Sequence, residues 1–548
     1  MSLMGQMMQM PLLISSLLTH AARHSGDTEI VSKRVEGDVH RTNWAQLAVR
    51  ARKVAQALAR LGCQPGDRVG TLAWNGYRHL ELYYGTSGSQ LVCHTINPRL
   101  FPEQIAWIVG DADDKVLCFE INFLPLVEKL LPHLGRVQHF VLMAGRSHMP
   151  ASSPIPNLLC YEELVEAENG DYVWPQFDEN TASSICYTSG TTGNPKGAVY
   201  SHRSSLLHAF GAALPDAMGC SARDVILPVV PMFHVNAWGL PYATALVGCK
   251  VVFPGPHLDG KSLFELFENE KVTFSAGVPT VWLGLLTYVK QNNLKFSSFK
   301  RTVIGGSACP PAMIRTLEDD YGVEVIHAWG MTEMSPLGTL SKLKSKHESL
   351  DEDSKRRILE KQGKVIYGVD MEIVDDDNKP LPWDGKASGN LVVRGHWVID
   401  RYYRSDKSPL VEVAGLDGQW FPTGDVAAID EDAYMQITDR SKDVIKSGGE
   451  WISSIELENI AMAHPAVHEA AVIACPHPKW DERPLLVVVK KPGGELTREQ
   501  MLGFFEGRIA KWQIPDDVVF VDELPHTATG KLQKLKLREQ FRGHQLPA

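Results

Sequence analysis

The chain is 548 residues long, 44% of them hydrophobic, and 65 acidic against 55 basic side chains give a formal net charge of −10. This length can bury large cores and predicts two or more domains. The negative net charge argues against a general binder of nucleic acid or of anionic membranes, although a local basic patch is compatible with it. The nine cysteines include no Cys-x-x-Cys pair, which suits a reduced cytoplasmic protein better than a disulfide framework or a zinc site. No uncharged apolar run approaches about 18 residues, and no basic region precedes a cleavage site, so neither a membrane span nor a secretion signal is expected.

Helix and strand signals alternate between residues 40 and 120. Asn43 stands before an apolar spacing that runs to Gly62, which predicts a helix with an N-cap and a C-terminal glycine. The remaining signals predict strands near 67–73, 92–96 and 115–119 and helices near 81–87 and 102–109. This alternation favours a largely parallel sheet covered by helices, and a proline-rich connector follows at residues 149–156.

Residues 187–197 (Tyr-Thr-Ser-Gly-Thr-Thr-Gly-Asn-Pro-Lys-Gly) are the most informative stretch of the chain. Short apolar runs at 184–187 and 198–200 flank it, which predicts a strand, a loop and a second strand. The glycines allow a left-handed backbone and close approach to a ligand, and the N–H groups, the hydroxyls and Lys196 can donate to phosphate oxygens. It lacks the Walker pattern. The alternative is a surface turn, but turns seldom combine this hydroxyl run with a Gly-x-Pro-Lys-Gly ending.

Downstream of that stretch, the sequence predicts several strands that end in turns. Residues 227–239 contain two prolines and predict a strand end followed by a loop and a helix, and residues 271–280 predict a strand that leads into a helix near Pro279. Further strands are expected within 302–310, 324–330, 389–395, 419–425, 434–440, 470–474 and 485–489. Residues 341–357 are rich in Lys, Ser, Glu and Asp and indicate an exposed helix or loop. Helices are expected from Ser453 or Ser454 to His464, and after a capping box at Thr497 and Gln500.

Residues 187–197 resemble the phosphate-loop signature of the adenylate-forming enzymes, which include acyl-CoA synthetases, peptide-synthetase adenylation domains and luciferases. An aromatic-Gly-x-Thr-Glu box at 329–333, a Thr-Gly-Asp box at 423–425, a charged hinge box at 434–443 and a Pro-x-x-x-x-Gly-Lys box at 525–531 follow in the order of that family. The resemblance covers residues 40–535. It implies an α/β fold with a large N-terminal domain at residues 1–440, made of helix-covered mixed sheets and a β-barrel-like portion, and a small mobile α+β lid at residues 441–548.

The resemblance also implies a two-step reaction that uses ATP, Mg²⁺ and coenzyme A. A carboxylate reacts with ATP to give acyl-AMP and pyrophosphate, the lid then rotates about Lys442, and the CoA thiol displaces AMP. Lys531 is the implied catalytic lysine of the first step, where a fixed cation stabilises the charge that develops at phosphorus. A solvated surface lysine is the alternative for Lys531, and a solvated face is the alternative for the basic tail Lys534, Lys536 and Arg538, which could also aid CoA phosphate binding.

The nucleotide site implied by the resemblance consists of residues from each of these boxes. Trp329 is expected to stack on adenine, Asp425 to accept hydrogen bonds from the ribose hydroxyls, and Arg440 to contact ribose or phosphate. Glu333, a hard oxygen ligand, is expected to hold Mg²⁺ with help from Thr188; a solvated or capping carboxylate is the alternative for Glu333. The implied ATP and AMP contacts are Thr188, Ser189, Gly190, Thr191, Thr192, Gly193, Lys196, Gly306, Ser307, His327, Ala328, Trp329, Gly330, Met331, Thr332, Asp425, Ile437, Arg440 and Lys442.

The acyl and CoA sites are implied by two further strings. His234 is the family's motif histidine beside both pockets and is the third implied catalytic residue, with Lys531 and Glu333; a satisfied structural histidine is the alternative. The acyl contacts implied are Val235, Asn236, Trp238, Gly277 and Ala308, and the CoA contacts are Lys446, Gly448, Gly449, Glu450 and Trp451. Core packing is the alternative for Trp238, and close packing is the alternative for Gly277.

The identity of the acid is the least determined feature. Residues 234–238 and 277–282 look like medium- and long-chain fatty acyl-CoA synthetases, and look equally like the ligase for 3-methylthiopropionate, which the chain also resembles at residues 97–104. We expect a medium- to long-chain fatty acid and hence a role in lipid metabolism, with the short thioether acid as the alternative. Luciferase-type oxygenation of the adenylate, a non-catalytic adenylate-binding protein and loading of a carrier protein also stay open. Relatives of the fatty-acid type suggest a cytoplasmic homodimer.

Overall fold

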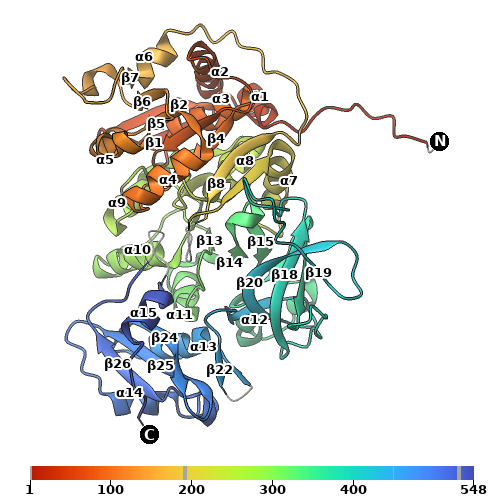
Figure 1. The fold of residues 1–548 in the computed structure, drawn as a ribbon, viewed down its shortest axis with the longest axis vertical. Coiled ribbons are helices and arrows are strands. Elements are labelled where there is room, and N and C mark those ends of the chain that lie inside the picture. Colours follow the sequence, from red (N-terminus) through yellow and green to blue (C-terminus); the bar gives the residue numbers. More distant parts are fainter. Residues whose placement is uncertain (1–2, 189–193, 448–449, 527–531, 548) are drawn as a thin grey trace.

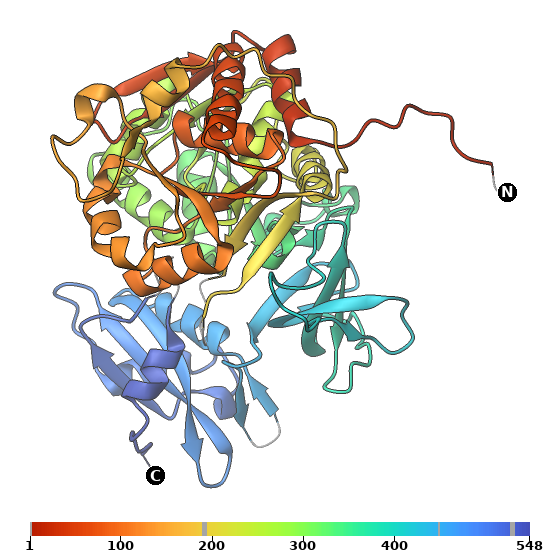
Figure 2. The same cartoon turned by 45° about the horizontal axis from the view of Figure 1, so that its top comes forward.

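The computed structural model describes residues 3–188, 194–447, 450–526 and 532–547. Its larger part contains two mainly parallel sheets with helices between them and on their outer faces (Figures 1 and 2). The seven-stranded sheet is parallel except that β9 runs antiparallel to β8. Its strands, in spatial order, are β7 (Leu159–Cys160), β6 (His139–Leu142), β5 (Asp114–Phe119), β3 (Arg68–Leu72), β4 (Val92–Thr95), β8 (Ala182–Tyr187) and β9 (Gly197–Ser201).

The nine-stranded sheet is parallel in its centre and antiparallel at both edges. Its strands, in spatial order, are β16 (Lys364–Val365), β15 (Leu337–Leu340), β14 (Glu324–Gly330), β13 (Arg301–Ile304), β12 (Phe274–Gly277), β10 (Val225–Pro228), β11 (Lys250–Phe253), β1 (Glu29–Lys33) and β2 (Val39–Asn43). The mixed, helix-covered sheets expected from the sequence are therefore confirmed.

A layer of helices separates the two sheets. One hydrophobic cluster joins side chains of both sheets to α1 (Ile14–His24), α2 (Trp44–Arg60), α3 (Tyr77–Gly88), α7 (His202–Ala213) and α8 (Leu240–Val247). Every residue of α3 is buried. The N-cap predicted for α2 is confirmed, because the Asn43 side chain accepts a hydrogen bond from the Gln46 backbone. The helix turns one apolar face inward, at the 3.6-residue period of an amphipathic helix, through Trp44, Leu47, Ala51, Val54 and Leu58.

Other helices cover the outer faces of the sheets. The seven-stranded sheet packs against α4 (Pro102–Ala112) and α5 (Leu124–Leu130), and α6 (Tyr161–Glu166) packs beside α2. The nine-stranded sheet packs against α9 (Gly260–Glu270), α10 (Pro279–Gln291) and α11 (Pro311–Arg315). The exposed segment predicted at 341–357 contains the first part of α12 (Glu352–Leu359), none of whose residues is buried. No helix in the described part of the chain is both long enough and apolar enough to cross a membrane.

A third, antiparallel sheet lies beside the α/β part and leads to the C-terminal region. It consists of β17 (Val369–Val374), β18 (Ser388–Gly395), β20 (Gln419–Ile429), β19 (Val411–Glu412) and β21 (Met435–Arg440), of which β21 pairs with β20. The family resemblance implied a barrel-like portion within residues 1–440 without giving its bounds, and this antiparallel sheet is the part of the structure that comes nearest to it. Its described strands pair in an open row.

The C-terminal region forms a separate α+β unit below the large domain (Figure 1). It contains β22 (Ile445–Ser447), β23 (Glu450–Ile452), α13 (Ser454–Met462), β24 (Val467–His477), β25 (Asp481–Lys490), α14 (Arg498–Phe505), β26 (Asp517–Val521) and α15 (Lys534–Gln540). Two hydrophobic clusters form its core, and neither includes a residue before Ile445. The Thr497 and Gln500 capping box predicted for α14 is present. The exact domain boundary at Arg440 stays a prediction.

Candidate active site

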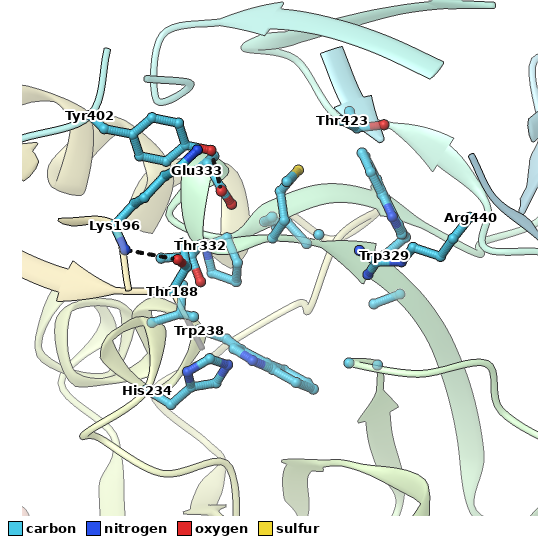
Figure 3. Close-up of a pocket in the computed structure, with 18 of the residues that line it drawn as sticks. Thr188, Lys196, His234, Trp238, Trp329, Thr332, Glu333, Tyr402, Thr423 and Arg440 are labelled. Atoms are coloured by element: carbon cyan, nitrogen blue, oxygen red, sulfur yellow. Dashed lines mark hydrogen bonds between the residues drawn. The ribbon is translucent and has the colours of Figure 1, made fainter. Parts of the chain in front are cut away.

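A cavity of about 280 Å³ lies where the carboxyl ends of β8, β13 and β14 meet the β20–β21 region (Figure 3). Open α/β sheets commonly bind ligands at the carboxyl ends of their strands. The residues that line the cavity are Thr188, Asn194, Lys196, Met218, His234, Val235, Trp238, Gly305, Gly306, Ala328, Trp329, Gly330, Met331, Thr332, Glu333, Pro336, Leu337, Tyr402, Thr423 and Arg440.

One corner of the cavity brings a cation, a carboxylate and a tyrosine together. The Tyr402 hydroxyl donates a hydrogen bond to Glu333 Oε1 at 2.7 Å, and Lys196 Nζ lies 4.9 Å from the centre of the Tyr402 ring. Burial and the nearby Glu333 carboxylate raise the pKa of Tyr402 well above its ordinary value, so its hydroxyl remains a donor. This corner can therefore present one positive charge and one oriented carboxylate to a phosphate chain.

Backbone contacts fix the segment that carries Tyr402. The Ile399 N–H donates to the Glu333 carbonyl at 2.9 Å, and the Tyr403 N–H donates to the Gly197 carbonyl at 2.8 Å. On the other side, Thr188 and Lys196 are joined by two hydrogen bonds across the start and end of the glycine-rich stretch. Segments far apart in the sequence thus converge on the same corner.

A second corner surrounds a buried carboxylate. Asp425 is 4% exposed, Trp329 Nε1 donates to its Oδ2 at 2.9 Å, and Arg440 Nε lies 2.9 Å from its Oδ1. The Trp329 indole lies directly against the backbone of Gly338, where a Cβ atom would be 2.6 Å from the ring, so only glycine fits there. The indole orientation is therefore fixed on one side by this packing and at its N–H by Asp425.

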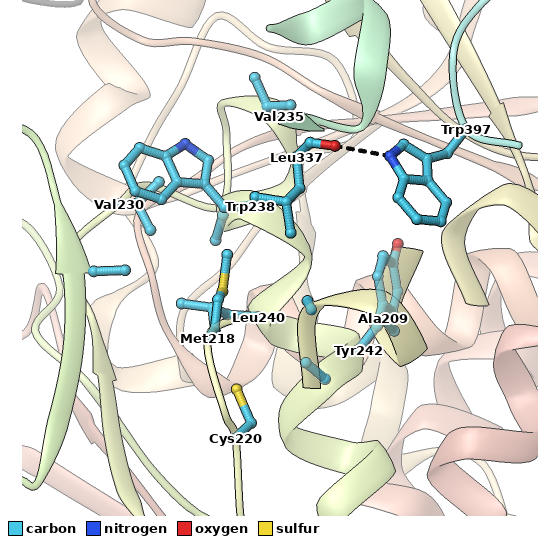
Figure 4. Packing of buried hydrophobic residues seen from close by; sticks show 14 of the residues in the cluster. Ala209, Met218, Cys220, Val230, Val235, Trp238, Leu240, Tyr242, Leu337 and Trp397 are labelled. Atoms are coloured by element: carbon cyan, nitrogen blue, oxygen red, sulfur yellow. Dashed lines mark hydrogen bonds between the residues drawn. The ribbon is translucent and has the colours of Figure 1, made fainter. Parts of the chain in front are cut away.

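The opposite end of the cavity is apolar. Val235 and Trp238 line it together with Met218 and Leu337. Behind them the cavity ends against buried side chains of the central cluster, and Figure 4 shows Trp238 beside Val230 and Met218. A ligand with a polar, phosphate-bearing part at the Lys196 corner and an apolar part at Trp238 matches this distribution.

The comparison with known families agrees with the geometry. The model of the AMP-binding enzyme family matches residues 17–403, and the model of the AMP-binding enzyme C-terminal domain matches residues 456–531. The chain belongs to the AMP-binding enzyme family. The family and the fold predicted from the sequence are therefore confirmed.

Curated relatives of this AMP-binding enzyme match it over nearly its whole length. It is 56% identical to a 3-methylmercaptopropionyl-CoA ligase of Ruegeria lacuscaerulensis over 98% of this chain and 99% of the relative. It is 53% identical to a medium-chain-fatty-acid–CoA ligase of Ectopseudomonas oleovorans over 98% of each chain. Among solved structures, the anthranilate CoA ligase AuaEII in complex with anthranoyl-AMP is similar with a TM-score of 0.84 and 26% identity, over 97% of this chain and 98% of that one.

Many residues predicted for the site of this AMP-binding enzyme line the cavity. They are Thr188, Lys196, His234, Val235, Trp238, Gly306, Ala328, Trp329, Gly330, Met331, Thr332, Glu333 and Arg440. Asp425 lies directly behind Trp329 and Arg440 through the contacts given above. Ser307 and Ala308 are exposed on the turn after β13, Ile437 is half-buried on β21, and Lys442 is exposed on the turn that follows β21.

Three further predicted residues do not line the cavity. His327 is buried, with its Nδ1 2.9 Å from the Glu360 carbonyl and its Nε2 accepting from the Cys309 N–H, and burial lowers its pKa to about 4. Gly277 makes room for Trp282, whose ring would lie 3.3 Å from a Cβ there, so its close-packing alternative describes it better than an acyl contact. Asn236 does not line the cavity, because its side chain bonds to β8 and α3.

The predicted CoA residues are only partly described. Lys446 is exposed on β22 and its Nζ lies 5.7 Å from the centre of the Trp451 ring on β23. Gly448, Gly449 and Lys531 lie outside the described residues, as do residues 189–193 of the glycine-rich stretch, and the side chain of Glu450 is not described.

Several cavity residues were not predicted from the sequence. They are Asn194, Met218, Gly305, Pro336, Leu337, Tyr402 and Thr423. Asn194, Gly305 and Thr423 belong to recognised motifs, so their closeness in sequence to the predicted residues could have identified them. Met218 and Tyr402 lie in segments without a recognised motif, and only the folded chain brings them to the cavity.

The cavity residues fit a magnesium ion that arrives with ATP. The described part of the chain contains no group of three or more His, Cys, Asp or Glu side chains that could hold a metal. Magnesium commonly needs only one or two carboxylates besides substrate phosphates and water. Glu333, with the Thr188 hydroxyl in the same cavity, supplies that donor set.

Replacing Tyr402 by phenylalanine should lower kcat/KM for Mg·ATP by about 10- to 100-fold, the scale of a lost hydrogen bond to a charged group. The ring that supports Lys196 remains, so the loss reports on the orientation of Glu333. Steady-state kinetics with varied Mg·ATP measure it, and Tyr367→Phe, at a position 85% exposed, is the control. Equal kinetics for the Tyr402 variant and wild type would show that the hydroxyl does not orient Glu333.

Proposed function

We propose that this protein is an AMP-forming acyl-CoA ligase that activates a fatty carboxylic acid of medium to long chain and transfers the acyl group to the thiol of coenzyme A. One observation carries the proposal: a single cavity has three chemically different regions. Lys196 and Glu333 form one corner, Trp329 with its hydrogen bond to the buried Asp425 forms a second, and Trp238 lies at the apolar end. These three regions correspond to phosphates, adenosine and acyl chain.

In the first half-reaction, each of these cavity residues has a separate role. Lys196 and the Thr188 hydroxyl bind phosphate oxygens, and Trp329 stacks on adenine. Asp425 accepts hydrogen bonds from the ribose once the Arg440 side chain moves aside, while Trp329 keeps its place. Glu333 would hold Mg²⁺, which neutralises charge on the phosphates when bound. The acid carboxylate attacks the α-phosphorus beside His234, the bond to pyrophosphate breaks, and Lys531 stabilises the developing charge.

The second half-reaction uses the same cavity after the lid has turned. Ser441 follows β21 directly, and we place the hinge at Lys442, with the lid at residues 441–548. Rotation removes Lys531 and brings β22 and β23, with Lys446 and Trp451, to the entrance. Gly448, Gly449 and Glu450 complete the proposed set of CoA contacts. The CoA sulfur attacks the acyl carbonyl, the bond to AMP oxygen breaks, and AMP leaves.

The short thioether acid is a second candidate substrate. The apolar end is only one part of a cavity whose whole volume is about 280 Å³, which is below the usual range of ligand pockets, roughly 300 to 1,000 Å³. The relative from Ruegeria lacuscaerulensis is named for 3-methylmercaptopropionate, whereas the relative from Ectopseudomonas oleovorans is named for medium-chain fatty acids. A longer acid requires space that Trp238 and Met218 fill in this conformation.

The substrate profile tests the proposal. AMP formation is measured with Mg·ATP and CoA across straight-chain acids of about two to sixteen carbons and with 3-methylthiopropionate. We expect a maximum at about eight or more carbons, and Trp238→Ala should shift it to longer acids because about 150–250 Å² of aromatic surface is removed from the acyl end. A maximum at four or five chain atoms would favour the short-acid ligase. No AMP with any acid would overturn the assignment.

A cytoplasmic homodimer is part of the proposal, and the N-terminal arm supports the dimer. Residues 3–10 leave the domain as an extended segment (Figures 1 and 2), with Leu3, Met7 and Met8 94%, 83% and 87% exposed. We assign this arm to the contact between two copies because its apolar side chains are largely uncovered within one chain. Light scattering should give the mass of two chains for the full protein and one for a variant that lacks residues 3–10.

A further inference from the structure

The segment that carries the apolar end of the cavity has an unusual backbone. Val235, Asn236, Ala237 and Trp238 have φ angles of 47°, 50°, 48° and 56°, and Gly239 follows at 76°. Side chains with a Cβ rarely adopt this left-handed region, and a β-branched residue such as Val235 is a true outlier there. Backbone strain of this kind persists only where surrounding contacts determine it, and it gathers at functional sites.

Asn236 supplies contacts that can hold this turn. Its Nδ2 donates to Ser184 Oγ at 2.9 Å, its Oδ1 accepts from Cys186 Sγ at 3.3 Å, and its Oδ1 also lies 3.1 Å from the Tyr83 hydroxyl, whose one proton is shared with the Met232 carbonyl. The residue is 2% exposed. The partners lie on α3 of the central helix layer and on β8 of the seven-stranded sheet, so two elements fix the amide.

The side chains of this turn point in two directions. Val235 and Trp238, three residues apart, line the cavity together with His234, while Asn236 points away from it into β8. Strand β8 ends at Tyr187, and Thr188 at the phosphate corner follows directly. The amide therefore anchors the turn to Ser184 and Cys186 within β8, and the backbone pairing of β8 with β4 and β9 holds that strand independently of residue 236.

We propose that Asn236 is a positioning residue that holds the left-handed turn through Ser184, Tyr83 and Cys186 and thereby sets how Val235 and Trp238 receive the acyl chain. The inference rests on the proposed function, because it assigns the acyl group to this end of the cavity. Asparagine suits the role because it tolerates the left-handed region better than most residues while its amide provides both a donor and an acceptor.

The key variant is Asn236→Gly, which keeps the left-handed backbone allowed and removes only the amide contacts. We expect KM for the acid to rise by about tenfold or more and the chain-length optimum to broaden, since small displacements of binding groups have effects of this order. KM for ATP should change by less than about twofold, because the phosphate and adenine corners do not depend on the turn. If Asn236 only stabilised the fold, the variant would raise both KM values together, or would lower the melting temperature and leave the ratio of the two KM values unchanged.

The matched control removes a hydrogen bond between the same two elements. Ser87 on α3 donates to the Ser183 carbonyl on β8 at 3.0 Å and does not touch the turn, so Ser87→Ala should leave the acid KM and the chain-length profile unchanged. Ser184→Ala, which removes one partner of Asn236, should reproduce part of the effect, and the double variant with Asn236→Gly should show no further loss.

The outcomes separate this inference from the proposed function. If wild type forms no AMP with any acid, the proposed function fails and the inference falls with it. If wild type is active and Asn236→Gly keeps the acid KM and the chain-length profile, the positioning role is wrong while the ligase assignment stands. Should Asn236→Gly fail to fold, Ser184→Ala decides: a selective rise in acid KM supports the role, and wild-type kinetics overturn it.

Discussion

Replacing Glu333 by glutamine is expected to slow adenylate formation by about 10²- to 10³-fold, the scale observed when one oriented group that stabilises transition-state charge is removed. The amide keeps the shape and can still accept from Tyr402, but it no longer carries the charge that would hold Mg²⁺. Pyrophosphate release with a saturating acid and varied Mg²⁺ measures the effect. The loss should ease at high Mg²⁺, because the defect concerns the binding of the metal–nucleotide complex.

Glu324→Gln is the matched control for this change. Glu324 begins the same strand β14 that ends just before Glu333, and it is exposed and paired with Lys342. Its loss should leave pyrophosphate release within about twofold of wild type, as for most surface changes. Equal rates for Glu333→Gln and Glu324→Gln at low Mg²⁺ would contradict the metal role of Glu333.

Replacing Lys531 by alanine is expected to slow the first half-reaction and to leave the second half-reaction unchanged. Formation of acyl-AMP should fall by about 10²- to 10³-fold, because a fixed cation at the reacting phosphorus is lost, whereas transfer from supplied acyl-AMP to CoA should stay near the wild-type rate. Single-turnover assays of each half-reaction provide the measurement. The reason for the split is that lid rotation removes Lys531 before the thiol reacts.

Lys511→Ala is the control, since Lys511 begins the short helix η8 (Lys511–Gln513) of the same lid and is exposed. Both half-reactions should keep their rates in this variant. Lys534 is unsuitable because it is buried and paired with Glu458, so its loss would disturb the lid core. Equal loss in both half-reactions for Lys531→Ala would refute the proposed alternation of the lid.

The sequence predicted the parts of the site that depend on contiguous residues. Lys196 and Thr188 lie at the ends of one glycine-rich stretch between β8 and β9, and Trp329 and Glu333 lie in a single box at the end of β14. Their spacing along the chain fixes their spacing in space, so they reach the same cavity. The family and the helix-covered mixed sheets were predictable for the same reason, because ordered boxes and alternating elements are local signals.

The remaining features depend on contacts between distant segments or on side-chain direction. Tyr402 reaches Glu333 from a loop 69 positions away, and no periodicity marks it. Strand β1 was not predicted, since it pairs in parallel with β11 more than 200 positions later. Asn236 belongs to a string that indicated the acyl site, but the left-handed turn directs its amide to β8. A sequence motif does not state which way each side chain points.

The helix layer between the two sheets has a consequence for synthesis on the ribosome. Helix α1 packs against α8, β1 pairs with β11, and Trp44 Nε1 donates to the Cys249 carbonyl at 3.0 Å. The N-terminal segment therefore lacks its permanent neighbours until about residue 253 has left the exit tunnel, and until then the apolar faces of α1, α2 and α3 have no complete cover. Transiently exposed apolar surface of this kind is prone to aggregation, and chaperones act on such surface.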